Sequence, residues 1–337
     1  MKIPVWLYPS ALPRNDHDFF KILLEKKEQF TSDIEMKEHL KSWQPQQSWL
    51  INIAGFSRML PPIYRKELQQ HIIKNLKRRH QLMAIGYLIP ALIFLVIFML
   101  FGFEVSALGW SLVFVSLSLL YTAEYRLGLS QVKGIKERAL FFYWLYNSKA
   151  VKRSLLVCAT FGLFIGSLQL LLNNDLGSEE DLFRLYGVMY ESLSNHEYWR
   201  LLTGPNLHYS MLHFFNNFLM LLMIGTLCIS LIGYKSVLVF FVGNAIGAYF
   251  QFLLGSQELN NCGGISFGVY SLFGLMLGFN LCVRQILPQG FAISLFIIVL
   301  IGLLFSELLI SNSASVGHFT GLLFGVISNL LFLRATE

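Results

Sequence analysis

The stretches CGGISFGVYSLFGLMLG at residues 262–278 and SASVGHFTGLLFG at residues 313–325 decide the fold. Both are uncharged apart from one histidine, and each starts an apolar run with a residue capable of chemistry. In the first run that residue is Ser266, and in the second it is His318. Polar groups are costly inside a bilayer unless they are paired, so each of the two calls for a functional hypothesis.

A tyrosine and three glycines continue the helix faces of these two residues. Tyr270 and Gly274 follow the serine at intervals of four, and Gly321 and Gly325 follow the histidine at three and seven residues. Residues with these spacings share one face of a helix. Small residues four apart let membrane helices approach closely, so the two faces predict that the two helices pair.

Charge is missing from much of the rest of the chain as well. Of the 337 residues, 55% are hydrophobic and 14% are charged, against about 25% charged in soluble domains. This excludes an ordinary cytosolic fold, a disordered chain and a disulfide scaffold. A membrane-spanning helix needs about 20 apolar residues. Eight uncharged stretches approach or exceed that length: 81–103, 105–123, 154–174, 201–234, 236–257, 259–283, 285–306 and 308–333.

The pattern predicts an all-α polytopic membrane protein whose main part is a six-helix core at residues 153–335. A transmembrane hairpin at 81–127 precedes the core, and a basic cytosolic linker at 128–152 joins the two. Residues 1–80 are rich in charge and predict a small cytosolic N-terminal region. The apolar stretch 139–148 is short and has basic neighbours, which favours a segment at the membrane interface.

The charged loops predict the orientation. Basic residues gather at 65–79 and again at 126–153, whereas the loop at 174–200 is acidic. Because basic loops stay in the cytoplasm, both termini are expected to be cytoplasmic. The first residues, MKIPVWLYPS, lack the apolar core of a signal peptide, so no cleavage is expected. A bacterial inner membrane fits these features, and a eukaryotic compartment stays open.

The net charge of +6 is consistent with cytoplasmic loops beside an anionic bilayer, and we expect no nucleic-acid partner. The chain's four cysteines are predicted to be small buried side chains without metal or disulfide roles. They are Cys158, Cys228, Cys262 and Cys282. No cofactor or metal is expected.

The paired faces suggest nucleophilic catalysis. A serine hydroxyl attacks a peptide bond only when a nearby base takes its proton, and His318 is placed to be that base for Ser266. No carboxylate lies nearby in the spans, so the pair would be a dyad, with Tyr270 packed against the imidazole. We expect the serine Oγ within about 3.5 Å of an imidazole nitrogen.

A tetrahedral intermediate also needs hydrogen-bond donors for its oxyanion. Asn217 and His208 are the candidate side-chain donors, and the Ser266 amide is a candidate backbone donor. His213 shares a helix face with Asn217 and either joins the site or supports it. Interhelical hydrogen bonding is the competing interpretation of these residues.

Taken together, these residues resemble the rhomboid family of intramembrane serine proteases over roughly residues 150–335. The resemblance rests on an ordered set: Trp199-Arg200, then His208, His213 and Asn217, then Gly264-Ile265-Ser266 with Tyr270, then His318 with Gly321 and Gly325. It implies a six-helix bundle, a water-accessible cavity open to the outer face, a short fourth core helix that starts at the serine, and a first loop partly embedded in the membrane. It also implies catalytic roles for Ser266 and His318.

The chain departs from the family pattern at two positions. Phe267 stands where the family usually has glycine after the serine, and Gly204 stands where some relatives have histidine. Two activities therefore remain open. One is a serine endopeptidase that cuts transmembrane proteins whose helices are weakened near the cut, and the other is a pseudoprotease that binds membrane helices without cleavage. An unrelated transporter is disfavoured because the last six spans lack charges at mid-membrane.

Overall fold

The structure is a computed structural model and describes all residues except 1–3, 8–11, 15–20, 24–26, 30–37, 39, 41, 54, 101–104, 256–258, 310–313 and 331–337. The predicted end of the core at residue 335 therefore lies outside the described residues. The described chain divides into two compact units. One comprises residues 1–148 and 285–304, and the other comprises residues 149–284 and 305–337. Helix α13 (Phe291–Leu309) runs from the first unit into the second.

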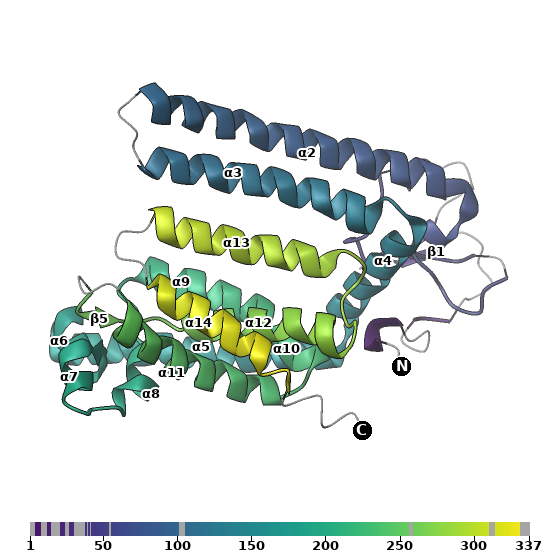
Figure 1. Cartoon of the computed structure of the whole chain (residues 1–337). Coiled ribbons are helices and arrows are strands. Elements are labelled where there is room, and N and C mark those ends of the chain that lie inside the picture. The colour runs from purple at the N-terminus through teal and green to yellow at the C-terminus, as the bar shows by residue number, and fades with distance from the viewer. Residues whose placement is uncertain are drawn as a thin grey trace. The chain divides into compact units, whose positions relative to one another are not determined.

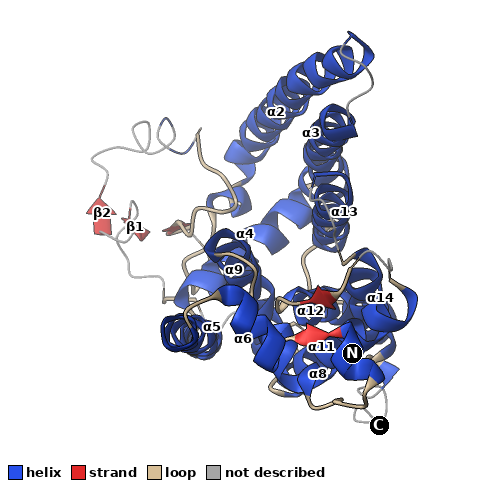
Figure 2. Ribbon diagram, turned by 90° about the vertical axis from the view of Figure 1, so that its left-hand side faces the viewer, coloured by secondary structure: helices blue, strands red, loops and turns tan. Residues whose placement is uncertain are grey.

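The first unit contains a small antiparallel sheet and a long helical hairpin. Strands β1 (Lys21–Leu23), β2 (Lys27–Gln29) and β3 (Leu50–Ile51) pair in the order β2-β1-β3, with Ile22 opposite both Glu28 and Ile51. Short 3-10 turns lie at Val5–Leu7 (η1) and Pro62–Tyr64 (η3). Helices α2 (Lys66–Leu100) and α3 (Val105–Glu124) then run side by side in opposite directions, as Figures 1 and 2 show. A π-helical turn, η4 (Tyr125–Leu129), follows α3.

Aromatic rings hold the hairpin together. Phe114 of α3 stacks on Tyr87 and Phe94 of α2, with ring centroids 6.4 and 5.8 Å apart. Near these rings, the Ser111 hydroxyl donates to the Ala91 carbonyl at 2.9 Å, which satisfies a polar group that lipid could not. Helix α2 begins at Lys66, well before its apolar stretch, so the predicted hairpin boundary at 81 marks a change of composition within one helix.

The segment predicted as a linker with an interfacial stretch folds as helix α4 (Val132–Asn147) inside the first unit. Its Phe141 is fully buried and packs against Trp6 and Phe291, at centroid distances of 6.0 and 5.3 Å. Arg138 of α4 donates to Glu124. Most apolar side chains of 139–148 are thus covered by protein, whereas Tyr146 is exposed, and the contact of this stretch with the membrane interface stays a prediction.

The second unit is almost entirely helical. Its longest helices are α5 (Lys149–Leu176), α9 (Met211–Met220) continued by η6 (Leu221–Gly225) and α10 (Thr226–Leu231), α11 (Lys235–Leu254), α12 (Ser266–Gly278) continued by η7 (Phe279–Val283), and α14 (Ser315–Ile327). Short helices α6 (Glu179–Tyr186), α7 (Tyr190–Ser194) and α8 (Arg200–Thr203), with the turn η5 (Gly204–Asn206), form the first loop. Strands β4 (Val188–Met189) and β5 (Asn261–Cys262) join this loop to the segment before α12.

Within the described residues, six helical segments are long and apolar enough to cross a membrane: 66–100, 106–129, 149–176, 211–231, 235–254 and 266–283. The apolar helices 291–305 and 315–327 are shorter. The chain is therefore an all-α integral membrane protein with several spans. All eight predicted stretches contain helix, and in the last five the described helix is shorter than the uncharged stretch.

Helices α11, α12 and α14 pack on one another in the second unit, and Figure 2 shows α12 beside α14. A Cβ on Gly321 would lie 2.3 Å from the Phe267 carbonyl oxygen, and one on Gly325 would lie 1.9 Å from that of Ser271. In return, a Cβ on Gly274 would lie 2.0 Å from the Leu322 carbonyl oxygen. Only glycine allows this approach of α12 and α14, as the two glycine faces suggested.

All four cysteines are free thiols. Three are buried as predicted, whereas Cys282 is exposed. The prediction of burial was therefore wrong for Cys282, which lies in the last turn of its helical segment.

Candidate active site

The structure brings Ser266 and His318 together. Ser266 is the first residue of α12, and His318 lies in the first turn of α14. Their side chains lie at the same end of the close α12–α14 contact, with the imidazole Nε2 2.8 Å from the serine Oγ. This distance is within the 3.5 Å expected for a nucleophile and its base. Only 7% of Ser266 and 9% of His318 is exposed, so the pair is shielded from bulk solvent.

Two aromatic rings hold the imidazole of His318. The Tyr270 ring, one turn along α12 from the serine, lies 4.8 Å from it between centroids, at an angle of 42°. The Phe267 ring lies 5.4 Å away at 55°. Tyr270 therefore occupies the position predicted for it. Packed rings limit imidazole rotation and keep Nε2 directed at the hydroxyl.

The segment before the serine approaches α9 closely at Gly264. This residue has φ +106°, a conformation that favours glycine. A Cβ here would lie 2.7 Å from the His213 ring and 3.1 Å from the Asn217 Nδ2 atom. Glycine at this position thus lets two of the predicted site residues reach the backbone beside Ser266.

Asn217 presents an unpaired donor at this place. The residue is buried, and its Nδ2 atom has no hydrogen-bond partner among the described residues. A buried N–H group without a partner is uncommon and needs an explanation. Its position beside Gly264 fits a donor to a charge that develops only during reaction. The Ser266 amide, at the first position of α12, has no acceptor within its own helix and is a second such donor.

His208 contacts the segment that leads to the serine. Its Nε2 atom accepts from the Ile265 amide, 3.4 Å away, so the ring supports the segment that leads to the serine. Gln169 of α5 holds His208 in turn, because its side chain bonds both the His208 carbonyl at 2.6 Å and the amide at 2.9 Å. His208 thus contacts the backbone just before the serine, and its role as an oxyanion donor stays a prediction.

His213 is partly exposed and packs in a row of rings. Its ring lies 5.2 Å from that of His208 and is stacked at 6.1 Å on that of Tyr209. Tyr209 also donates to the Asn261 side chain at 2.7 Å, which ties α9 to strand β5. In the described part of the chain, no group of three or more His, Cys, Asp or Glu side chains is placed to hold a metal ion.

Comparison with known proteins identifies this part of the chain. The family model of the rhomboid domain matches residues 195–335. This range runs from the end of the first loop through α14. It includes every site residue described above except Gln169. Residues 195–335 are a rhomboid domain. The resemblance seen in the sequence is thereby confirmed, and the fold is that of a family of intramembrane serine proteases. A search among curated proteins found no match to the chain.

The side-chain amides of two α11 residues hold the starts of α12 and α14 in the rhomboid domain, and the sequence analysis did not single them out. The Asn244 Oδ1 atom accepts from the Gly268 amide at 3.0 Å, in the first turn of α12. The Gln251 Oε1 atom accepts from the Gly317 amide at 2.9 Å, next to His318. Both are almost fully buried. Their spacing of seven along an apolar helix, which places them on one face, was the available signal.

Arg200 of the Trp199-Arg200 pair anchors the first loop. The Arg200 guanidinium donates to the carbonyl oxygens of residues 184, 185 and 187 at 2.9–3.1 Å and to Glu197 at 2.6 Å. It also lies 4.7 Å from the centroid of the exposed Trp199 ring. The loop is paired through β4 to β5, four residues before Ser266, so the arginine fixes a segment that borders the site.

Phe267, the departure from the family's serine motif, is fully buried and directed toward α11 and α14. A Cβ on Gly247 would lie 2.6 Å from its Cβ atom, and one on Gly317 would lie 2.5 Å from its ring. The ring thus occupies space that these two glycines leave open. Gly204 packs in the same manner, since a Cβ there would lie 2.4 Å from the Val188 amide nitrogen.

Proposed function

We propose that the chain is an intramembrane serine endopeptidase that hydrolyses peptide bonds in or near the transmembrane helices of membrane proteins, with Ser266 and His318 as a catalytic dyad. The observation that carries the proposal is the 2.8 Å separation of Oγ and Nε2 in a buried site of a rhomboid domain. A nucleophile within hydrogen-bond reach of an oriented base is the arrangement that serine hydrolysis requires.

The reaction follows from the positions of these groups. Nε2 of His318 takes the Ser266 proton as Oγ attacks the substrate carbonyl carbon. The oxyanion so formed accepts from the Asn217 Nδ2 group and the Ser266 amide. The intermediate collapses, and His318 gives its proton to the leaving amine. A water molecule then attacks the acyl-enzyme, giving its proton to His318, and Oγ recovers that proton when the carboxylic acid leaves.

The substrate class follows from the setting of the site. Backbone hydrogen bonds shield the peptide bonds of a membrane helix, so a helix must unwind before its carbonyl reaches Ser266. Substrates should carry glycine, proline or polar residues near the cut. The charged loops support a bacterial inner membrane with both termini in the cytoplasm, and lipid is then the surrounding partner.

The proposal is tested by labelling the purified full chain in detergent with a fluorophosphonate and assaying cleavage of a single-span substrate. Wild type should be labelled and active, whereas Ser266→Ala should lose both properties and His318→Ala should lose nearly all of both. Ser271→Ala is the matched control. Ser271 lies on α12 too and is fully buried, but its hydroxyl donates to the Phe267 carbonyl at 2.9 Å. Equal labelling of wild type and Ser266→Ala would refute the assignment.

The second candidate function is a rhomboid pseudoprotease, and Phe267 is the feature that favours it. The same experiment separates the two. Binding of membrane helices with neither labelling nor cleavage by the wild type would favour the pseudoprotease. The burial of the Phe267 ring against Gly247 and Gly317 supports the protease, because the ring takes up space between helices.

A further inference from the structure

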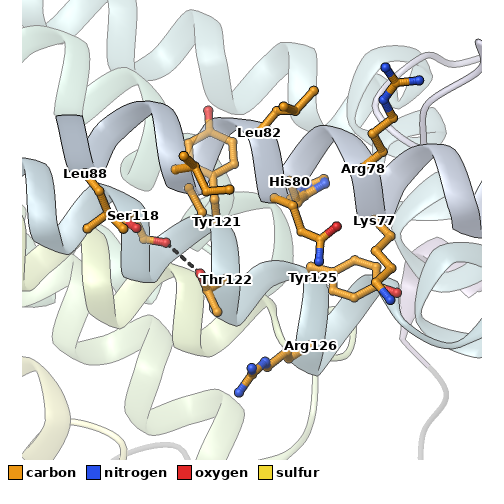
Figure 3. Close-up of a pocket in the computed structure, with 13 residues that line it drawn as sticks. Lys77, Arg78, His80, Leu82, Leu88, Ser118, Tyr121, Thr122, Tyr125 and Arg126 are labelled. Carbon is orange, nitrogen blue, oxygen red and sulfur yellow. Dashed lines mark hydrogen bonds between the residues drawn. The ribbon is translucent and has the colours of Figure 1, made fainter.

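A pocket of about 780 Å³ lies between α2 and α3 in the first unit, outside the rhomboid domain. One end of its wall is mostly apolar and the other end is basic. Figure 3 shows Leu88 and Ser118 at the first end and Lys77 and Tyr125 at the second. The apolar part is formed by exposed side chains of α2, namely Leu82, Ile85 and Leu88. The polar part is basic, and it includes Lys77, Arg78 and Arg126.

The pocket lies at a boundary between polar and apolar sequence. Lys77 and Arg78 immediately precede the uncharged stretch 81–103 of α2. Arg126 follows the uncharged stretch 105–123 of α3. Because the two helices are antiparallel, the three basic residues lie at the same end of the hairpin. In a membrane this end is at the level of the lipid headgroups, and the apolar side chains are at the level of the acyl chains.

The basic side chains are available for a ligand. All three are exposed, and among the described residues none has an ion-pair partner. The acidic residue nearest to them in α3, Glu124, is bonded to Arg138 of α4 and lies 3.7 Å from His80, so its charge is already matched. Long basic side chains at such a boundary keep their stems on apolar surface and their charges at the headgroups.

We propose that this pocket binds an anionic phospholipid. The lipid phosphate would bond Lys77 of α2 and Arg126 of the turn η4 after α3, with Arg78 adding positive charge at the same end of the hairpin, since arginine and lysine are the side chains that bind phosphate. The part of an acyl chain nearest the headgroup would lie along Leu82 and Ile85. The bound lipid would join the headgroup ends of α2 and α3. This site is independent of the proposed catalytic function.

The test uses the delipidated full chain in detergent, mixed with equal amounts of a phosphatidylglycerol and a phosphatidylcholine that carry the same acyl chains. Native mass spectrometry then measures how much of each lipid stays bound. Wild type should prefer phosphatidylglycerol, and the double variant Lys77→Gln/Arg126→Gln should weaken its binding on the order of thirty-fold. Phosphatidylcholine binding should change little.

A matched control removes the same charge at another boundary. Lys152 and Arg153 are exposed and directly precede the apolar stretch of α5 at residue 154. The double variant Lys152→Gln/Arg153→Gln should keep the wild-type preference. A loss of preference equal to that of the pocket variant would show general attraction to the basic surface and would overturn the proposal. So would equal binding of the two lipids by wild type.

A further arm distinguishes the lipid from its phosphate alone. Glycerol phosphate, which has no acyl chain, is added as a competitor to the chain loaded with phosphatidylglycerol. Displacement only at concentrations far above that of the lipid supports a lipid site. Displacement at equal concentration would show an anion site without acyl recognition and would overturn the proposal.

Discussion

Replacing Gly321 by alanine should separate the proposed catalytic pair. The added Cβ would lie 2.3 Å from the Phe267 carbonyl oxygen, whereas ordinary contact begins at 3.4 Å. The contact is with backbone, which has no rotamer to change, so α14 must move from α12 by about 1 Å. His318 lies one turn from Gly321 on the moving helix and would leave hydrogen-bond distance of Ser266.

The magnitude follows from that displacement. A misplacement of about 1 Å costs about a hundred-fold in rate, which equals about 2.7 kcal/mol at 1.36 kcal/mol for each factor of ten. Overpacking should also destabilise the fold by about 1–3 kcal/mol, less the gain of up to about 1 kcal/mol from the higher helix propensity of alanine. The assay measures kcat/KM for a single-span substrate and the rate of fluorophosphonate labelling, with Tm taken on the same preparation.

Gly86→Ala is the matched control. Gly86 also lies inside a long membrane helix, α2, but a Cβ there meets nothing within 4 Å. This variant should keep wild-type activity and have an equal or higher Tm, because only the propensity gain remains. The reasoning would be refuted if Gly321→Ala labelled as fast as Gly86→Ala with an unchanged Tm, since the helix contact would then not set the distance between the pair.

Three other changes test the surroundings of the pair. Asn217→Ala should lower kcat by about ten- to a thousand-fold and leave Tm unchanged, because its Nδ2 atom has no partner before reaction; full turnover with a lowered Tm would contradict this. Gln251→Leu leaves the Gly317 amide unpaired, so the free energy of unfolding should fall by about 1–3 kcal/mol, Tm should fall with it, and labelling should slow. Unchanged labelling would show that this bond does not position His318. Phe267→Gly should lower both Tm and kcat, because the fully buried ring fills space at Gly247 and Gly317; increased turnover would show that the ring obstructs the site.

The sequence predicted well the features on which a bilayer places strict limits, namely the membrane helices and their close contacts. Charges are absent from the spans because lipid cannot solvate them, so the gaps locate the helices. Small residues at intervals of four are visible because close helix packing requires them, and Gly321 and Gly325 do lie against the backbone of α12. The positions of Ser266 and His318 followed from these two patterns.

The position of Phe267 could not be predicted from its neighbour. The sequence places a large ring next to the nucleophile, which suggests a narrowed cavity. Successive residues of a helix point about 100° apart, so the ring leaves α12 in a different direction from Ser266 and Tyr270 and packs against Gly247, Gly317 and the His318 ring. Whether such a ring fits depends on Gly247 and Gly317, which lie on two other helices and have no recognisable link to position 267 in one sequence.

The amides of α11 escaped prediction for a different reason. Asn244 and Gln251 bond backbone N–H groups, and every residue except proline has such a group. A side chain whose partner is backbone has no complementary residue type elsewhere in the sequence. The same holds for Gln169, which bonds the backbone of His208. A lone Asn or Gln in an apolar span can therefore be recognised as important, but the backbone group that it bonds cannot be identified from the sequence.

The direction of these hydrogen bonds divides the polar residues of the domain into two kinds. A helix that begins within a membrane protein exposes N–H groups that have no acceptor in their own first turn. His208, Asn244 and Gln251 each accept from one such group at the start of α12 or α14, or just before it. These acceptors complete the fold. Asn217 presents a donor, and that donor is unpaired. A resting site in which these three backbone amides are paired while the Asn217 Nδ2 group stays unpaired is suited to a negative charge that exists only during reaction.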